Sequence, residues 1–454
     1  MSTAHLSDSM LYGHLWSTSE VHDLFDDEAR IATWLEILVA LAQSQAEVGL
    51  IPEQAASLIQ QHAKAGRLDL EEIAERTRVT GHSTLGLIQH LRSMLPDEAA
   101  EWIYYGATVQ DLTDTWTAIV MGRVLDIVDR DLSALMSTLA TLAERHANTL
   151  MCGRSHGQPG LPITFGFKVA VWLSEALRHK DRLAEIRPRC MVAQLGGALG
   201  TMEFWDDQGV RLLESFARRI GLGVPDIAWL TARDGVAEFL NVLAMITATL
   251  GKIGQEVYDL QRPEIGEVTE SWRRGQVGSI TMPHKRNPEA SEHLVTLSRL
   301  VRLQAAAGLE AMVHEHERDG RAWKTEWIVL PEACMFTAVA LQVARELVAG
   351  LQVHPLRMRQ NVEANAGYLM SERVMRVLAD RVGKHRAHEL VYEAVMRGQD
   401  GGISFRDAIL EDDAVMDAMT SKELDDCLDT ALTTRPALRF VDRVLSRTKG
   451  EQAK

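Results

Sequence analysis

The residues best placed to do chemistry lie at 278–288, in the order Gly-Ser-Ile-Thr-Met-Pro-His-Lys-Arg-Asn-Pro. This segment brings together a hydroxyl (Ser279), a cation (Lys285) and an amide (Asn287). Glycine allows backbone conformations that other residues resist, and Asn-Pro is typical of a helix start. Because a helix start carries partial positive charge, such a loop is suited to stabilising negative charge that develops during a reaction. By composition alone, the same residues would form an ordinary polar surface loop.

The order of these residues resembles the signature of the fumarase/aspartase superfamily, Gly-Ser-Ser-x-Met-Pro-x-Lys-x-Asn-Pro. Every fixed position matches except the second serine, which is Ile280 here. The resemblance implies that Ser279 is the base that removes a proton beside a carboxylate. It also implies that Lys285 and Asn287 stabilise the resulting charge. Ile280 leaves the base in place but removes one hydroxyl from the pocket.

A second polar segment, at 153–159, reads Gly-Arg-Ser-His-Gly-Gln-Pro. Histidine can donate a proton near neutral pH because its unperturbed pKa is about 6.5. The segment resembles the Gly-Arg-Thr-His-Gly-Gln motif of the adenylosuccinate and argininosuccinate lyases. That resemblance implies that His156 protonates the leaving group, beside Ser155 as a substrate-binding residue, and that Glu292 orients His156. The alternative for Glu292 is an ordinary acidic residue in the first turns of a helix, favoured by the helix dipole.

A third polar segment, at 106–115, has the glycine and the dense hydroxyls of a turn that opens a helix. Simple N-capping by Thr108 or Asp111 is one interpretation. The segment also resembles a second superfamily motif, Gly-Ala-Thr-x-Gln-Asp-x-x-Asp-Thr, which implies that Thr108 and Gln110 bind substrate. His82, in a polar break between helical patterns, matches a histidine near the substrate in adenylosuccinate lyases; a capping or surface histidine is the alternative.

The segment at 314–332 points to a different branch of the superfamily. It resembles the 3-carboxy-cis,cis-muconate cycloisomerases, with His-Glu-Arg followed by Trp, Glu-Trp and Leu-Pro-Glu. Adenylosuccinate lyases usually have Ser-Glu-Arg before the Leu-Pro, where the serine and the arginine help to bind the nucleotide phosphate. Thr325 and Trp327 stand at those places here. We therefore expect adenylosuccinate to be a poor substrate.

The elements that position these segments are predicted to be helices. Apolar residues recur at helical spacing over long stretches, and few stretches alternate, so we predict an all-α fold. The longest predicted helical stretches are 19–49, 112–146, 165–186, 233–260 and 288–312. The resemblance implies three helical domains: residues 1–97, a central long-helix bundle at 98–350, and a small C-terminal domain at 351–454. It also implies a homotetramer built on the long helices, in which each active site draws on three subunits.

Composition limits the partners. The chain has 454 residues and a net charge of −15, which argues against nucleic acid as its main partner. We see no signal peptide and no apolar run approaching the ~20 residues that span a bilayer. Its four cysteines are widely spaced and form no metal-ligand pattern. We expect a cytoplasmic enzyme that acts on a small carboxylate, without a membrane partner, a metal or an organic cofactor.

The sequence therefore predicts a lyase that releases fumarate from a succinyl compound by cleaving a C–N or C–O bond. One alternative is a 3-carboxy-cis,cis-muconate cycloisomerase, favoured by Gln110 and the segment at 314–332. Another is a catalytically silent structural homologue like the lens crystallins of this superfamily. The presence of Ser279, Lys285 and His156 argues against that last alternative. The sequence does not name the substrate.

Overall fold

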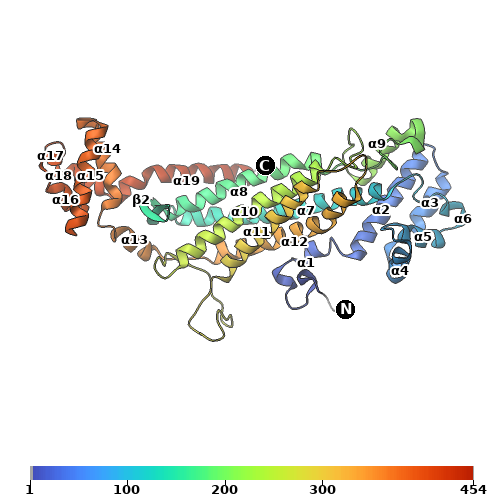
Figure 1. The fold of residues 1–454 in the computed structure, drawn as a ribbon, viewed down its shortest axis with the longest axis horizontal. Helices are drawn as coiled ribbons and strands as arrows, with labels where there is room; N and C mark the ends of the chain where they lie inside the picture. Colours follow the sequence, from blue (N-terminus) through green and yellow to red (C-terminus); the bar gives the residue numbers. More distant parts are fainter. Residues whose placement is uncertain (1–3, 453–454) are drawn as a thin grey trace. The chain divides into compact units, whose positions relative to one another are not determined.

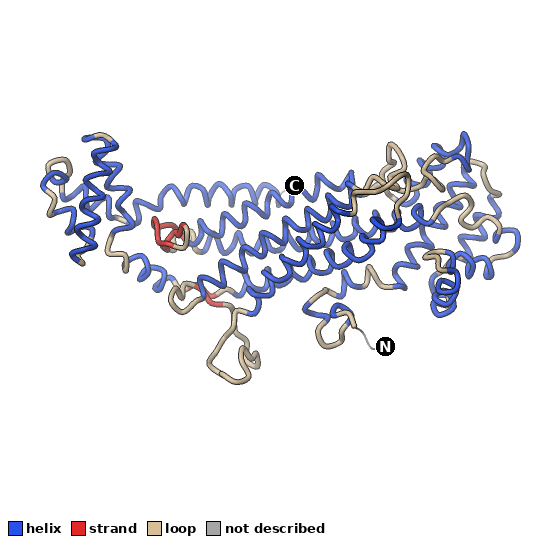
Figure 2. Tube along the Cα trace, viewed as in Figure 1, coloured by secondary structure: helices blue, strands red, loops and turns tan. Residues whose placement is uncertain are grey.

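The computed structural model describes residues 4–452, and most of these residues are helical (Figures 1 and 2). The predicted all-α fold is confirmed. Within the described residues the strands form only two small antiparallel pairs. These are β1 (Leu150–Ser155) with β2 (Gln158–Thr164), and β3 (Val268–Thr269) with β4 (Gln352–Val353).

The chain forms two compact units. Unit 1 consists of the chain up to Asp131 together with His179–Ala248 and Leu297–Gln342. Unit 2 consists of Leu132–Arg178, Thr249–Thr296 and the chain from Val343 onward. The three domains implied by the resemblance stay a prediction.

Long helices contribute residues to both units. They are α7 (Val109–Arg145), α8 (Phe165–Cys190), α10 (Asp234–Gln261), α11 (Glu289–Glu310) and α12 (Gly320–Gly350). The predicted stretches at 112–146, 165–186, 233–260 and 288–312 match the first four to within a few residues. Helices α10 and α12 are long and apolar enough to cross a membrane by length and composition. However, 72% and 67% of their most apolar windows are buried, as in the core helices of a globular protein.

The predicted helix at 19–49 is wrong in one respect, because the structure divides it. Helix α1 (Ser19–His22) ends before α2 (Asp27–Glu47) begins. The break is set by Asp26, whose carboxylate accepts a hydrogen bond from the Ala29 N–H at 2.6 Å and so caps α2. The spacing of apolar residues alone does not reveal this N-cap.

Shorter helices complete each unit. Unit 1 adds the α-helices α3 (Glu53–His62), α4 (Leu70–Thr80), α5 (Leu85–Met94), α6 (Asp97–Ala100) and α9 (Gly209–Ile220), and the 3₁₀ helices η1 (Leu6–Asp8), η2 (Gly13–Leu15), η3 (Ala65–Arg67) and η4 (Glu203–Gln208). Unit 2 adds α13 (Pro355–Glu363), η5 (Tyr368–Met370), α14 (Ser371–Val382), α15 (Lys384–Gly401), α16 (Phe405–Leu410), α17 (Asp413–Met416), α18 (Ser421–Leu428) and α19 (Thr430–Gln452). Helices α14 to α18 pack around a buried apolar cluster that includes Val374, Leu390 and Phe405.

Candidate functional site

The signature loop, residues 270–288, runs between β3 and α11 in unit 2 (Figure 2). The Ser279 hydroxyl oxygen accepts a hydrogen bond from the Met282 N–H at 3.0 Å, and the Asn287 amide donates to the Gly278 carbonyl at 2.8 Å. A Cβ at Gly278 would lie 2.5 Å from the Lys285 carbonyl oxygen, so the close approach of the backbone requires glycine there. These contacts fold the loop on itself while the Lys285 side chain stays exposed.

Ile280, which replaces the second signature serine, is 96% exposed in the single chain. Exposure of an apolar side chain beside Ser279 indicates that this part of the loop is free to meet another surface. The loop is therefore held by its own hydrogen bonds, with Ile280 and Lys285 exposed and Ser279 half-buried.

The predicted role of the helix start after this loop is wrong for the single chain. The Ala290 and Ser291 N–H groups at the start of α11 donate to the Glu270 carboxylate at 3.2 and 2.9 Å. The Ser291 hydroxyl donates to the same carboxylate at 2.6 Å. A carboxylate is favoured at a helix N-terminus, and Glu270 already occupies this one. Asn287 does not cap α11 either, because its side-chain amide binds within the loop.

His156 lies at the tip of the β1–β2 hairpin in unit 2. It follows Ser155, which pairs with Gln158 across the hairpin, and its φ of 52° is the left-handed conformation of a tight turn. Both side chains are exposed, and among the described residues His156 has no side-chain hydrogen bond. Glu292, in the first turn of α11, is also exposed and is not bonded to His156 in the described chain. The orientation of His156 by Glu292 stays a prediction, since the two side chains are not bonded to each other within one chain.

The end of this hairpin next to the tip is fixed by a buried ion pair. The Arg154 guanidinium donates to both carboxylate oxygens of Glu267, at 2.9 and 2.8 Å. Glu267 is fully buried and also accepts a hydrogen bond at 2.8 Å from Asn361 on α13. Such a bidentate pair restrains the strand that leads to His156.

Thr108 and Gln110, in unit 1, are brought together by Arg318. The guanidinium donates to the Thr108 hydroxyl at 2.8 Å and to the Gln110 amide oxygen at 2.9 Å. The Gln110 amide also donates to the Asp114 carboxylate and the Leu230 carbonyl, both at 3.1 Å. A half-buried arginine between a hydroxyl and an amide is an arrangement that can bind a carboxylate. Sequence reasoning missed Arg318 as a binding residue, although its His-Glu-Arg segment was part of the resemblance.

Asp111 anchors the chain beside this group. Its carboxylate accepts hydrogen bonds from the N–H groups of Gly196 at 2.8 Å, Gly197 at 3.1 Å and Thr108 at 2.9 Å. Burial raises the pKa of Asp111 to about 6, although these hydrogen bonds act in the opposite direction. Its role is structural: it fixes the turn that precedes α7.

His82 occupies the predicted polar break, between α4 and α5 of unit 1. Its ring is exposed, and Nδ1 accepts a hydrogen bond from the Thr84 N–H at 3.4 Å. The contact is local, so the substrate-binding role of His82 stays a prediction.

A buried ion cluster links α7 to α12. Arg233 pairs with Asp114 at 2.8 Å and donates from Nε to Glu326 at 2.8 Å. The Trp323 indole donates to Asp114 at 3.0 Å. Because Asp114 also binds Gln110, this cluster connects the Arg318–Thr108–Gln110 group to the start of α12.

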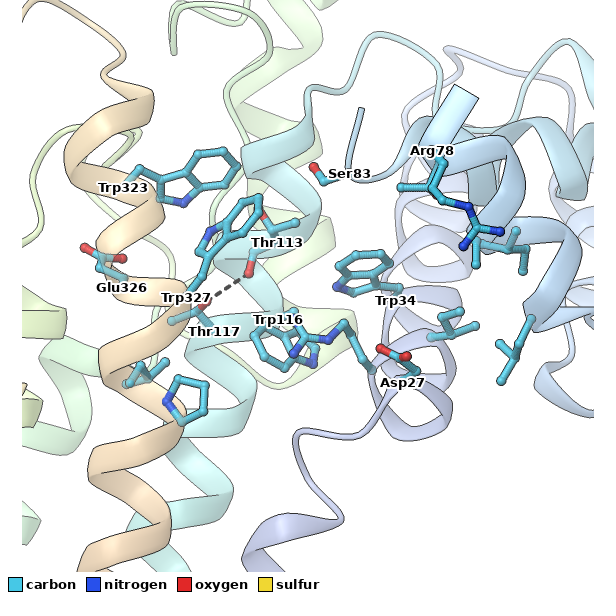
Figure 3. Close-up of a pocket in the computed structure, with 18 residues that line it drawn as sticks. Asp27, Trp34, Arg78, Ser83, Thr113, Trp116, Thr117, Trp323, Glu326 and Trp327 are labelled. Carbon is cyan, nitrogen blue, oxygen red and sulfur yellow. Dashed lines mark hydrogen bonds between the residues drawn. The ribbon is translucent and has the colours of Figure 1, made fainter. Parts of the chain in front are cut away.

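The same unit contains a cavity of about 460 Å³, which we call the tryptophan cavity (Figure 3). Its walls come from α2, α4, α7 and α12, and Figure 3 shows Trp34, Trp116, Trp323 and Trp327 around it. The Arg30 guanidinium lies 4.3 Å from the ring centroid of Trp116. Burial lowers the pKa of Arg30, and the nearby Asp27 opposes that shift. The sequence did not indicate this cavity, because its four tryptophans lie on three helices that are distant in the sequence.

The predicted residues thus fall into two groups within one chain. Unit 1 holds His82, Thr108 and Gln110, and unit 2 holds the rest: Ser155, His156, Ser279, Lys285, Asn287 and Glu292. Their catalytic and binding roles stay predictions.

Two family models match this chain. The model described as lyase matches residues 15–303, and the model described as adenylosuccinate lyase C-terminus matches residues 367–444. The chain belongs to the fumarase/aspartase superfamily of lyases. The predicted family and the predicted class of enzyme, a lyase, are confirmed.

Relatives that match nearly the whole chain are named for different activities. The N-acetyl-S-(2-succino)cysteine lyase of Dickeya dadantii (strain 3937) is 40% identical over 447 residues, 98% of each chain. The 3-carboxy-cis,cis-muconate cycloisomerase of Acinetobacter baylyi is 34% identical, over 98% of this chain and 99% of the relative. The crystal structure of a fumarate lyase from Mesorhizobium sp. BNC1 matches with a TM-score of 0.88 and 34% identity, covering 95% of this chain and 98% of the other.

Proposed function

We propose that this enzyme eliminates a thiol from an S-(2-succino) thioether of an N-acylated cysteine and releases fumarate. The observation that carries the proposal is the signature loop, which holds the Ser279 hydroxyl and the Lys285 cation on one glycine-dependent turn. The substrate class is supported by the Dickeya dadantii relative, which is named for a succinylated cysteine. The sequence predicted C–N or C–O cleavage; cleavage of a C–S bond is the same elimination with a different leaving atom.

In this mechanism Ser279, as the alkoxide, removes a proton from the methylene carbon of the succinyl group. The electron pair left on that carbon is delocalised onto the neighbouring carboxylate. It then forms the double bond of fumarate while the C–S bond breaks and the sulfur leaves with its bonding electrons. Serine is a weak base until neighbouring groups favour its deprotonated form. Lys285 supplies positive charge, and each such preorganised contact is often worth about 10²–10³ in rate.

We assign His156 to protonation of the leaving sulfur. A thiol has an unperturbed pKa of about 8.5, so a thiolate leaves far more readily than an amine anion. His156 therefore assists the reaction without being indispensable for it. The Arg318–Thr108–Gln110 group is assigned to a substrate carboxylate.

The assembly is part of the same proposal. His156 and Glu292 are both exposed and are not bonded to each other in the described chain, and Ile280 is almost fully exposed. Assembly into a homotetramer would place surfaces of other subunits against these groups, so that each active site is completed by more than one subunit. We place the enzyme in the cytoplasm, since its four cysteines are all buried and unpaired, as suits a reducing compartment.

A panel of substrates tests the function. The purified enzyme is incubated with N-acetyl-S-(2-succino)cysteine, adenylosuccinate and 3-carboxy-cis,cis-muconate, and fumarate, thiol and lactone are measured separately. We expect fumarate and thiol in equal amounts from the thioether, and little turnover of adenylosuccinate because Trp327 replaces a phosphate-binding arginine. Absence of thiol release from the thioether would reject the proposal.

The second candidate is the cycloisomerase. It is favoured by the segment at 314–332 and by the 34% identity to the Acinetobacter baylyi enzyme. Addition of a carboxylate oxygen to a double bond is the reverse of an elimination in which a carboxylate leaves, so the same loop could serve it. Lactone formation from 3-carboxy-cis,cis-muconate, without thiol release from the thioether, would establish this candidate instead.

A further inference from the structure

The Gln110 side-chain amide is held in one orientation by its three partners. Nε2 donates to the Asp114 carboxylate and to the Leu230 carbonyl, both at 3.1 Å, and Oε1 accepts from Arg318 Nε at 2.9 Å. A carboxylate and a carbonyl only accept hydrogen bonds, whereas a guanidinium only donates them. A flipped amide would set its nitrogen against the guanidinium and its oxygen against the carboxylate. Asp114 and Leu230 therefore fix which atom of Gln110 meets Arg318.

Asp114 is itself held firmly and is a fixed acceptor for Gln110. It is fully buried, and each of its carboxylate oxygens accepts two hydrogen bonds. Oδ2 accepts from Arg233 Nη1 at 2.8 Å and from Gln110, and Oδ1 accepts from Arg233 Nη2 at 3.1 Å and from the Trp323 indole at 3.0 Å. Because Arg233 supplies the opposite charge, Asp114 does not need Arg318 as an ion-pair partner.

Arg318, by contrast, keeps its positive charge unmatched. Its hydrogen bonds to described residues all go to neutral groups: the Gln110 amide, the Thr108 hydroxyl at 2.8 Å and the Ala198 carbonyl at 3.4 Å. Within the described part of the chain, Nη2 donates no hydrogen bond. The Thr108 hydroxyl accepts from Arg318 and keeps its own hydrogen for another acceptor. A positive charge with unused donors beside it suits a carboxylate.

Gln110 is thus a neutral link between a carboxylate and a guanidinium. A direct ion pair between Asp114 and Arg318 would also orient the guanidinium, but it would cancel the charge that attracts a substrate. The amide of Gln110 has a donor end and an acceptor end, so it transmits orientation without carrying charge. Each end bonds to a charged group, and such hydrogen bonds are stronger than those between neutral groups.

We propose that Asp114 is a positioning residue for the substrate carboxylate, which acts through Gln110 on Arg318. It holds the Gln110 amide with its oxygen on Arg318 Nε, and so leaves Nη2 and the Thr108 hydroxyl hydrogen for one carboxylate of the substrate. This inference rests on the proposed function, because it concerns the group assigned there to a substrate carboxylate. It adds a buried residue that does not touch the substrate and yet sets the affinity for it.

The test compares Asp114→Asn with the matched control Glu326→Gln. Both substitutions remove a carboxylate that accepts from Arg233, but only Asp114 is bonded to Gln110. Calorimetric titration with fumarate measures the affinity for a small dicarboxylate without turnover. We expect Asp114→Asn to weaken fumarate binding about tenfold, as the loss of a hydrogen bond to a charged group does, and Glu326→Gln to leave it nearly unchanged. Equal effects of the two variants on fumarate binding would overturn the inference.

A double-variant cycle shows whether the effect passes through Gln110. Gln110→Leu removes both ends of the amide, so adding Asp114→Asn should weaken fumarate binding little further. Additive losses would mean that Asp114 acts by another route, and would overturn the inference. If Asp114→Asn does not fold, Gln110→Glu decides, because it keeps Asp114 but sets a carboxylate on Arg318. It should weaken fumarate binding, and unchanged affinity would contradict the role of the neutral link.

Kinetic measurements separate positioning from other effects, and this inference from the proposed function. With the thioether as substrate, Asp114→Asn should raise KM about tenfold and leave kcat nearly unchanged, the pattern of a lost binding interaction. A kcat that falls as far as kcat/KM would contradict a positioning role. If the wild type releases no thiol, the proposed function fails, whereas the fumarate titrations still decide the role of Asp114. A wild-type enzyme that does not bind fumarate would overturn the inference.

Discussion

Arg154, two residues before His156 in the hairpin, forms two hydrogen bonds, of 2.9 and 2.8 Å, with the fully buried carboxylate of Glu267. Arg154→Ala leaves this carboxylate without a positive charge in a buried place. We expect a loss of about 3–5 kcal/mol in the free energy of unfolding, measured by chemical denaturation.

Arg130 offers a matched control. It binds both carboxylate oxygens of Glu20, at 2.9 and 2.7 Å, but that pair is half exposed. Because solvent screens such pairs, Arg130→Ala should lower the free energy of unfolding by only ~0–1 kcal/mol. Equal losses in the free energy of unfolding for the two variants would show that burial of Glu267 does not increase the contribution of its ion pair to stability.

Stability should depend on pH through Asp111. Burial raises its pKa to about 6, above the unfolded value of about 3.9. Because the pKa is raised in the folded state, Asp111 contributes most to the free energy of unfolding below pH ~4. This contribution is lost as the pH rises through ~6. The stability advantage of the wild type over Asp111→Asn should therefore shrink by about 3 kcal/mol between these limits. Denaturation curves across this range test it, and an advantage that stays constant or grows with pH would contradict it.

The requirement for His156 should depend on the leaving group. With a succinyl thioether, His156→Ala should lower kcat less than about tenfold, because a thiolate departs without full protonation. With a succinyl amine as substrate the loss should reach about 10²–10⁴, the usual worth of general acid catalysis. Initial rates of fumarate release give both values. A severe loss on the thioether would mean that protonation limits that reaction too.

If each active site contains residues from different subunits, a mixture of two inactive variants should regain activity. Thr108→Ala and Ser279→Ala should each be inactive, yet a mixture that is dissociated and reassembled should regain activity. Random assortment gives about a quarter of the sites both wild-type residues if they come from different subunits. Light scattering should confirm a tetramer before and after mixing. Persistent inactivity of a properly reassembled mixture would place both residues in the site of a single chain.

What the sequence predicted well is local or periodic. The apolar stripe of α10 is an example, since Val236, Leu240, Leu243, Ile246, Leu250, Ile253, Val257 and Leu260 are all buried as their spacing indicates. The signature loop likewise lies next to a helix start. These features depend on residues close together in the chain.

What it missed depends on contacts between distant segments. Glu270 caps α11 from across the signature loop, Arg318 reaches Thr108 from another part of unit 1, and Glu267 fixes Arg154. The hairpin around His156 was missed because its strands are short and carry glycine and proline, which hide alternation. The tryptophan cavity is likewise assembled from separate helices.

The most direct test of the central claim is the rate of fumarate release from N-acetyl-S-(2-succino)cysteine by the wild type and by Ser279→Ala. The substitution removes one oxygen from an exposed loop, so the fold and the affinity for substrate should be nearly unchanged. We predict fumarate and thiol in equal amounts from the wild type. For Ser279→Ala we predict a kcat far below about a tenth of the wild-type kcat, since a factor of ten in rate is only about 1.4 kcal/mol of barrier. If Ser279→Ala keeps more than about a tenth of the wild-type kcat, Ser279 is not the base.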